Sequence, residues 1–302
     1  MQLQHVCIGG LFFRISQAER FLLEGVLPDY DKFHHSCFSK CNTIDVPVNI
    51  FVNKKNSTPY KKPDFTDGQT RKIWVGNNEI FVRESPRAFD NHLWECRIMP
   101  QKPLVEVFCG KPLIKKNTRN PIVSNPFGYP IDYLAAMHIL SFYEGIIVHA
   151  AGIVWQDYGF LFPGRSGTGK STFSKHFRDR NDSLCLSDDR IIIRKTKQHK
   201  FFMVGTPWLG EAGLCFNEKV CLNFLVFIRK SSRIKIVPVQ KENVLDRFLP
   251  ALSIPWYDSS ATTKMLKFCA TILMAIPVFE LYCPKKITNI DEIMKEIISY
   301  AS

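Results

Sequence analysis

Residues 164–171 carry a glycine-rich motif whose residue types and spacing suit phosphate binding. The segment reads Gly-Arg-Ser-Gly-Thr-Gly-Lys-Ser and satisfies every fixed position of the pattern G-x-x-x-x-G-K-[ST]. In this pattern backbone N–H groups surround the phosphates, the lysine reaches the β- and γ-phosphates, and the last hydroxyl ligates Mg²⁺. We expect ATP or GTP with Mg²⁺ to contact the whole loop and the residue after it, namely Gly164, Arg165, Ser166, Gly167, Thr168, Gly169, Lys170, Ser171 and Thr172.

The segments on either side of the loop support this interpretation. Residues 159–163 form a short apolar stretch typical of a buried strand, and residues 172–177 have the apolar spacing of an amphipathic helix. The alternative is a glycine-rich turn that matches the pattern by chance. Strand, loop and helix in this order is the setting in which the helix N-terminus favours a bound anion, so we prefer the phosphate-binding interpretation.

Two consecutive carboxylates, Asp188 and Asp189, follow the next predicted strand, residues 184–187. Carboxylates at the carboxyl end of a parallel strand lie at the same sheet edge as the phosphate loop. A single aspartate there is most often a cap or a turn residue, whereas two in succession favour a functional role. The later strand 222–228 ends in Arg229 and Lys230 and offers no acidic ligand. We therefore expect the aspartate pair to supply both a metal ligand and a general base.

Two further residues are candidates for the same edge. His149 lies in the apolar strand 146–154, where a histidine is usually a satisfied core residue, but its small neighbours leave room to touch one of the carboxylates. Both interpretations remain open. Glu211 ends the segment 205–211, which contains glycine, proline and Trp208. Such a segment can be a simple turn, or Glu211 can complete the metal shell.

Taken together, these motifs resemble the HPr kinase/phosphorylase-related kinases. The similar residues are His149, the loop 164–171, the run 187–189 and the segment 206–211, in this order, within residues 129–302. The resemblance implies an α/β fold with a P-loop nucleotide-binding core of the HPr kinase/PEP carboxykinase type. The segment 206–211 is similar to a divergent branch that includes kinases of lasso-peptide precursors. Sugar-uptake control and phosphorylase activity are therefore doubtful.

The resemblance also implies roles for the site residues. Ser171 and one aspartate hold Mg²⁺, while the other aspartate acts as base toward a serine hydroxyl and His149 supports that base. We assign Asp188 as the base and Asp189 to the metal, with Glu211 as a further metal ligand, although the two aspartates can be exchanged. The catalytic set is then Asp188, His149 and Lys170.

Composition limits the class of protein. The chain has 302 residues, 45% of them hydrophobic and 23% charged, as in ordinary globular proteins. The longest apolar run, near residues 272–279, is interrupted by Pro277 and is too short to cross a membrane. The ten cysteines include no C-x-x-C pair, which fits reduced thiols in the cytoplasm. The net charge of +12 is spread along the chain, without a nucleic-acid recognition motif, so a nucleic-acid partner is not expected.

The pattern along the chain predicts two domains. Residues 1–125 read as strands and turns, with strands at 46–52 and 71–75, a hairpin turning at 76–78, and a loop at 53–68. This β-rich domain is a candidate for acceptor recognition. Residues 126–302 alternate helices and strands and form the P-loop domain.

Several alternatives stay open. The preferred function is transfer of the γ-phosphoryl group of ATP to a serine of a peptide or protein, such as a ribosomally made precursor. The rivals are a kinase of a small hydroxyl metabolite such as free serine, and a nucleotide sensor without catalysis. The sequence also leaves open whether the chain forms a homo-oligomer. The spacing of His34, His35, Cys37 and Cys41 does not match a structural zinc module, and the basic loop with Lys54, Lys55, Lys61 and Lys62 suits either solvent or an acidic peptide.

Overall fold

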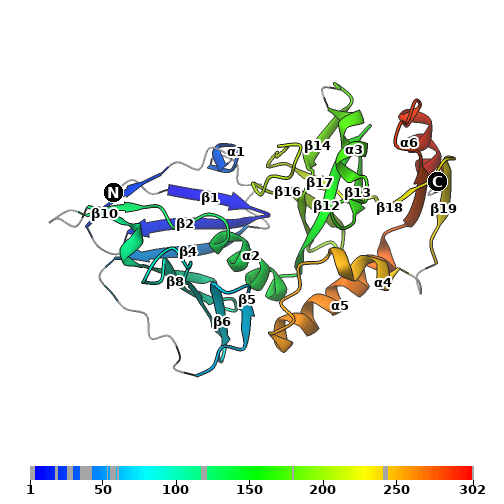
Figure 1. Ribbon diagram of the computed structural model, residues 1–302. Helices are drawn as coiled ribbons and strands as arrows, with labels where there is room; N and C mark the ends of the chain where they lie inside the picture. Colours follow the sequence, from blue (N-terminus) through cyan, green and yellow to red (C-terminus); the bar gives the residue numbers. More distant parts are fainter. Residues whose placement is uncertain are drawn as a thin grey trace. The chain divides into compact units, whose positions relative to one another are not determined.

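The computed structural model describes residues 4–17, 20–25, 30–34, 43–52, 54, 59, 61–116, 121–178, 180–240 and 244–300 (Figure 1). Contacts between Cα atoms divide the chain into two compact units, Met1–Tyr143 with Pro255–Thr263, and Glu144–Ile254 with Lys264–Ser302. The boundary therefore differs from the expected one after residue 125. Helix α2 (Ile131–Phe142) belongs to the first unit because it packs against strand β8 (Trp94–Met99) of that unit.

The first unit is rich in β-structure, as predicted. It contains an eight-stranded sheet of order β1-β2-β4-β9-β8-β7-β6-β5 and a three-stranded sheet of order β10-β11-β3. The remaining elements are β1 (Gln4–Ile8), β2 (Leu11–Gln17), β3 (Leu22–Glu24), α1 (Asp31–His34), β4 (Ile44–Phe51), β5 (Phe65–Asp67), β6 (Arg71–Val75), β7 (Ile80–Glu84), β9 (Leu104–Cys109), η3 (Lys111–Leu113), β10 (Ile114–Lys116) and β11 (Ile122–Ser124).

The predicted hairpin at residues 76–78 is confirmed, since β6 and β7 pair antiparallel across it. The prediction of a loop over residues 53–68 is wrong at β5, which pairs antiparallel with β6. Side-chain packing outweighs the polar sequence there, because Phe65 stacks on Tyr257 at a ring-centroid distance of 4.9 Å. Asp67 also accepts a hydrogen bond from Arg71 at 3.1 Å.

Three of the basic and metal-type residues of this unit, Lys54, Lys61 and His34, have local partners. Lys54 lies 4.7 Å from the ring centre of Phe51, and Lys61 pairs with Asp64 at 3.1 Å. The Nδ1 atom of His34 lies 2.7 Å from the carbonyl oxygen of His5. His35, Cys37, Cys41 and Lys55 lie outside the described residues.

The second unit is an α/β structure around a nine-stranded sheet of order β17-β16-β15-β12-β13-β18-β20-β19, with β14 also paired to β12. Its elements are β12 (Gly145–Trp155), β13 (Tyr158–Pro163), α3 (Lys170–Ser174), η4 (Lys175–Phe177), β14 (Ser183–Ser187), β15 (Arg190–Lys195), β16 (Phe201–Gly205), β17 (Lys219–Cys221), β18 (Phe224–Lys230), β19 (Lys235–Pro238), α4 (Leu245–Phe248), η6 (Leu249–Ala251), β20 (Val278–Cys283) and α6 (Ile290–Ser299). Helix α5 (Ser259–Ala275) begins in the first unit and ends in the second.

Strand β12 explains how the phosphate loop and the aspartate pair reach one edge. Both β13 and β14 pair antiparallel with β12, so they run in the same direction on its two sides. Ala150 of β12 lies opposite Pro163, and its N–H donates to the carbonyl of Asp189 at 2.9 Å. The common edge is therefore as expected. The strand at 184–187 runs parallel to β13, as expected, but β12 lies between the two strands and pairs antiparallel with both.

Two further strands end at this edge. Strands β13, β18 and β20 pair parallel in turn, so their carboxyl ends lie together. Aromatic packing holds them in register, with Phe160 of β13 stacked on Phe224 of β18 at a centroid distance of 4.9 Å. The phosphate-loop helix adds Phe173 and Phe177 to the same core, and α6 adds Ile293 and other apolar residues.

Two helix predictions need correction in length. The helix expected over residues 172–177 begins at Lys170 and changes from α to 3-10 geometry at Lys175. Of the helix expected over residues 242–249, only α4 is α-helical; Pro250 follows and the chain continues as the 3-10 turn η6, while residues 241–243 lie outside the described chain.

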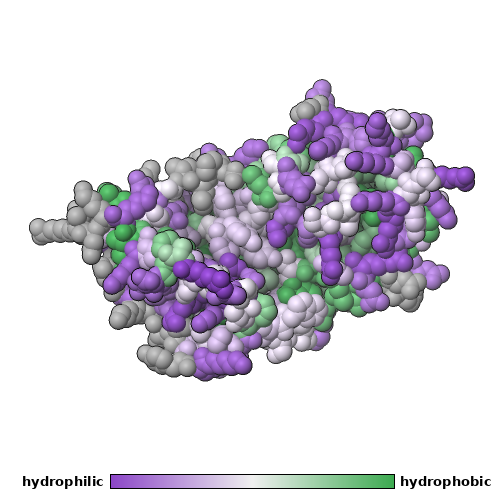
Figure 2. Space-filling view, in the orientation of Figure 1, coloured by the Kyte–Doolittle hydropathy of each residue, from purple (hydrophilic) through white to green (hydrophobic). Residues whose placement is uncertain are grey.

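The described part of the chain contains no helix with the length and apolarity that a membrane crossing requires. Figure 2 shows hydrophilic side chains over much of the displayed face of the second unit. Eight cysteines are described, seven of them buried, and no disulfide joins any two of these eight.

Candidate functional site

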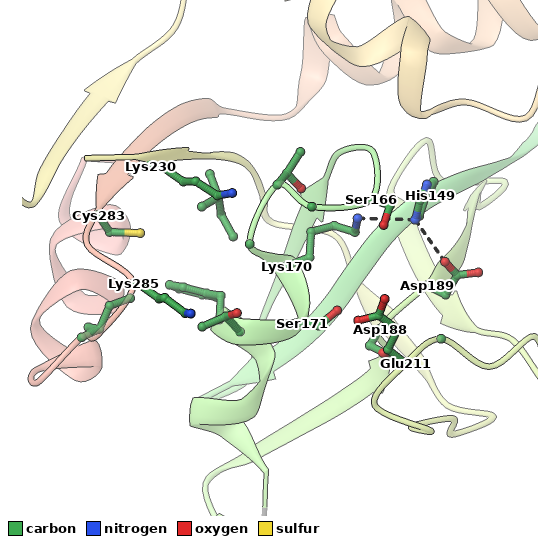
Figure 3. A pocket seen from close by; sticks show the side chains of 18 of the residues that line it. His149, Ser166, Lys170, Ser171, Asp188, Asp189, Glu211, Lys230, Cys283 and Lys285 are labelled. Atoms are coloured by element: carbon green, nitrogen blue, oxygen red, sulfur yellow. Dashed lines mark hydrogen bonds and ion pairs between the residues drawn. The ribbon is translucent and has the colours of Figure 1, made fainter. Parts of the chain in front are cut away.

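A pocket of about 860 Å³ opens at the edge where β13, β14, β18 and β20 end (Figure 3). All of its lining residues belong to the second unit. They are His149, Ser166, Gly167, Thr168, Gly169, Lys170, Ser171, Thr172, Phe173, Asp188, Asp189, Leu209, Gly210, Glu211, Ile228, Lys230, Ser231, Cys283, Pro284, Lys285 and Ile287.

The phosphate loop forms the centre of this lining. Gly167 and Gly169 have φ values of 82° and 104°, which glycine adopts without the steric penalty of a side chain. Their conformations turn the chain from β13 into α3. Residues 166–172 line the pocket. Gly164 and Arg165 do not; their carbonyl groups instead accept hydrogen bonds from Lys170.

Hydrogen bonds from its ammonium group hold the Lys170 side chain against the loop. Its Nζ donates to the carbonyls of Gly164 and Arg165 at 2.6 Å and 3.1 Å. The residue is only 5% exposed, and this burial lowers its pKa, while the carboxylates of Asp189, Asp188 and Glu211 act in the opposite direction. An ammonium has three donors, so two bonds to the loop fix Lys170 and leave one donor for a ligand.

Asp188 carries a carboxylate oxygen that lacks a partner. Its Oδ2 accepts a hydrogen bond from the backbone N–H of Ala212 at 2.8 Å. Its Oδ1 is buried and has no hydrogen-bond partner among the residues that the structure describes. A buried carboxylate oxygen left in this state is costly. An oxygen of this kind in a pocket wall fits a hard cation such as Mg²⁺.

Asp189 has a different environment, because charged groups surround its carboxylate. Its Oδ1 lies 3.0 Å from Nε2 of His149, and its Oδ2 pairs with the guanidinium of Arg190. Burial alone would raise the pKa of Asp189. The hydrogen bond from His149 and the charges of Arg190, His149 and Lys170 outweigh burial and hold this pKa below its usual value.

The contact with Asp189 holds the imidazole of His149 in place. Its Nε2 also lies 3.4 Å from Nζ of Lys170. A nitrogen that donates its proton to an ionised carboxylate cannot accept one from an ammonium. We therefore treat the contact with Asp189 as the hydrogen bond and the approach to Lys170 as packing. The structure thus joins His149 to Asp189, not to Asp188, the expected base.

Glu211 lines the pocket and is exposed to solvent, and its charge acts on Lys170. Within the described ranges, no group of three or more His, Cys, Asp and Glu side chains could by itself hold a metal ion. Mg²⁺ bound with a nucleotide usually takes one or two protein carboxylates and fills its other positions with phosphates and water. The oxygens of Ser171 and Asp188 fit that pattern, and Glu211 stays a candidate for a water-mediated contact.

The wall formed by the ends of β18 and β20 was not predicted from the sequence. It contributes Lys230, Ser231, Cys283 and Lys285 to the pocket (Figure 3). The three carboxylates among the described lining residues lie elsewhere, since Asp188 and Asp189 follow β14 and Glu211 lies in the later loop. The wall itself carries the lysines, so it is cationic. The sequence did show Arg229 and Lys230 at a strand end. Because consecutive parallel strands end at one edge of a sheet, this basic strand end was the signal from which the wall could have been predicted.

Neither a protein-family model nor a curated protein matches this sequence. Among solved structures, the Hpr(Ser) kinase/phosphatase from Coxiella burnetii matches with 12% sequence identity and a TM-score of 0.30, over 51% of this chain and 89% of that chain. A TM-score this low supports no conclusion about fold or activity. The chemistry of the pocket therefore has to be inferred from its own residues.

Proposed function

We propose that this protein is an ATP- and Mg²⁺-dependent kinase that transfers the γ-phosphoryl group to a hydroxyl. One observation carries the proposal: the phosphate loop with Lys170 and Ser171 shares a single pocket with Asp188 and Asp189. Phosphoryl transfer requires a held triphosphate, a metal, and a group that orients the acceptor. A loop that only binds nucleotide has no need for a buried, unpartnered carboxylate oxygen beside it.

The environments of the two aspartates favour an exchange of the roles first assigned to them. We propose that Asp188, with its unpartnered Oδ1, holds Mg²⁺ together with Ser171. A metal held there would neutralise negative charge on the triphosphate. Asp189 is then the base, and His149 orients it. Its lowered pKa keeps Asp189 ionised at neutral pH.

In the proposed step, the acceptor hydroxyl lies between Asp189 and the γ-phosphorus. The hydroxyl oxygen forms a bond to phosphorus while the bond from phosphorus to the β–γ bridging oxygen breaks, and ADP leaves with that electron pair. The hydroxyl proton passes to the Asp189 carboxylate. A weak base suffices, because a largely dissociative transition state depends more on alignment than on early proton removal.

The opposite wall suits the nucleoside half of ATP. A triphosphate whose γ-group lies near the aspartates extends along the loop toward Thr172, which also lines the pocket. Lys230, Ser231 and Lys285 then offer donors to the α-phosphate and the ribose. Ile228 and Ile287 offer apolar surface to the base.

We propose as acceptor a serine of a peptide or protein, recognised by the β-rich N-terminal unit, and a cytoplasmic location. The support for the acceptor is the sequence resemblance to kinases of precursor peptides, and the support for the location is the scattered cysteines without a C-x-x-C pair. Labelled ATP and Mg²⁺ are incubated with candidate peptides encoded beside this protein and, separately, with free serine and nucleosides. Label on a peptide serine supports the proposal, while label on a metabolite alone moves the acceptor to a small molecule. If ATP binds and neither is labelled, a sensor replaces the kinase.

A further inference from the structure

Asp188 is held by a backbone segment that follows strand β16. We define this segment, residues 206–213, as the clamp loop. Its Ala212 N–H donates to Oδ2 of Asp188 at 2.8 Å, and within the loop Gly213 N–H donates to the carbonyl of Gly210 at 3.2 Å. One carboxylate oxygen is thereby fixed to the loop. The other, Oδ1, is the atom without a described partner.

Gly210 lies against the aspartate pair more closely than any side chain would permit. A Cβ atom at this position would lie 2.7 Å from Oδ2 and 2.9 Å from Cγ of Asp188, and 2.9 Å from Cβ of Asp189. Real Cβ contacts are essentially never shorter than 3.0 Å. Because Asp188 is only 3% exposed, its carboxylate has little room to move away. Any residue larger than glycine therefore has to displace the carboxylate or the loop.

The clamp loop is itself anchored on both sides, so displacement of the loop is resisted. At its first residue, Thr206 Oγ1 donates to the carbonyl of Arg190 at 2.8 Å. After it, Phe216 N–H donates to the carbonyl of Leu186 at 2.8 Å. A third anchor comes from the end of the phosphate-loop helix, where the Arg178 guanidinium donates to the carbonyl of Ala212 at 2.8 Å.

We propose that Gly210 and Arg178 are positioning residues that set the orientation of Asp188 toward the metal of a bound nucleotide. The inference rests on the proposed function, since it concerns the same Mg²⁺ site. Gly210 acts by allowing the close approach of the loop, and Arg178 acts by holding the Ala212 peptide that hydrogen-bonds to Asp188. Neither residue contacts the reacting atoms.

The test measures equilibrium binding of ATP with and without Mg²⁺, which needs no acceptor and no turnover. If the proposed function holds, Mg²⁺ should strengthen ATP binding to the wild-type protein. Groups that orient a metal ligand typically contribute 10- to 100-fold to metal affinity. We expect Gly210→Ala to reduce the Mg²⁺-dependent gain by about tenfold or more on that scale, while ATP affinity without Mg²⁺ changes by less than about twofold.

A double substitution separates action through Asp188 from general damage. If Gly210→Ala acts by displacing the carboxylate, it has no further effect on the Mg²⁺-dependent gain once Asp188→Ala has removed that group. The matched control is Gly213→Ala in the same loop. A Cβ there meets nothing within 4 Å, although the residue has a φ of +66°, so it strains the backbone without touching the aspartates.

Arg178 supplies a second, independent readout if Gly210→Ala does not fold. Arg178→Ala should lower the Mg²⁺-dependent gain, and Arg178→Lys, which still carries a donor, should restore part of it. Wild-type protein without any Mg²⁺ effect on ATP binding would contradict the proposed function. A wild-type Mg²⁺ effect that survives in both Gly210→Ala and Arg178→Ala would contradict this inference alone, as would additive losses in the double mutant.

Discussion

At the scale of single residues, the two neighbouring aspartates differ in what surrounds their carboxylates. Asp188 is held by one backbone N–H and keeps a buried oxygen without a described partner. Asp189 is held by His149 and Arg190. Neighbouring carboxylates in unlike environments commonly divide the work of a site. Because of this difference, we propose Asp188 as the metal ligand and Asp189 as the base that accepts the proton.

His149→Gln tests this division through pH dependence. The interaction with His149 contributes to the low pKa of Asp189, whereas burial acts to raise it. Loss of the imidazole should therefore raise this pKa, so that Asp189 becomes protonated at a higher pH. We expect the acidic limb of kcat/KM to move to higher pH in the variant, with little change on the alkaline side. An unmoved acidic limb, measured with equal ATP affinity, would mean that His149 does not act on the base.

At the scale of elements, the sheet brings together strand ends that are far apart in sequence. Lys230 ends β18 and Lys285 follows β20, yet both face the pocket that begins at β13. We expect Lys230→Ala and Lys285→Ala to weaken ATP binding severalfold, because donors to the nucleoside half are lost. Binding of inorganic tripolyphosphate, measured by the same titration, should change much less. Equal losses for both ligands would indicate general attraction of anions instead of a nucleoside site.

Helix α5 offers a stability prediction that is independent of the nucleotide. Asp258 Oδ1 accepts a hydrogen bond from the N–H of Ala261 in the first turn, and its Oδ2 lies 3.4 Å from Nδ1 of the buried His138. Burial acts to raise the pKa of Asp258, but the interaction with His138 and the hydrogen bond from Ala261 lower it below its usual value. The ionised carboxylate therefore stabilises the fold above the pKa of the unfolded chain, and this contribution is lost as pH falls through the folded pKa.

Asp258→Asn keeps a capping side chain but removes the charge. Its free energy of unfolding at neutral pH should fall by about 1.5–3 kcal/mol, the usual contribution of a hydrogen bond to a charged group. Chemical denaturation across pH should show the difference from wild type shrinking as the solution becomes more acidic than about pH 4, near the ordinary aspartate pKa. A difference that stays constant with pH would show that the charge of Asp258 does not contribute.

From the sequence we predicted the site residues that lie in one continuous segment of the chain. The site residues that only the pairing of distant strands brings together were missed. The loop 164–171 and the pair Asp188–Asp189 could be found because strand, loop and carboxylates follow one another along the chain. The cationic wall could not be placed without knowing that β18 and β20 run parallel to β13. Strand β5 was missed because its pairing depends on the stacking of Phe65 on Tyr257, which is remote in sequence. Local patterns do not contain such contacts.

At the scale of the whole molecule, every residue that lines the pocket belongs to the second unit. We expect Mg²⁺ and ATP to slow amide hydrogen exchange in that unit, because bound ligand stabilises only the segments whose opening releases it. The strands of the first unit should exchange at unchanged rates. Slowing should be confined to the segments that line the pocket, namely 149, 166–173, 188–189, 209–211, 228, 230–231, 283–285 and 287.

Exchange at these segments that does not respond to ATP would contradict the assignment of the pocket. A matched control is Lys170→Ala, which should abolish the slowing because the lysine that reaches the β- and γ-phosphates is gone. The net charge of +12 attracts any anion at low ionic strength. The measurement is therefore made at physiological salt.

The most direct test of the account is a crystal structure of the protein with Mg²⁺ and a non-hydrolysable ATP analogue. The quantity to measure is the distance from the Asp188 and Asp189 carboxylates to the γ-phosphorus. We predict that Asp188 and Ser171 contact the metal and that Asp189 lies within direct or water-bridged reach of the γ-phosphate. Both carboxylates more than about 10 Å from the γ-phosphorus, beyond any water-bridged contact, would contradict it.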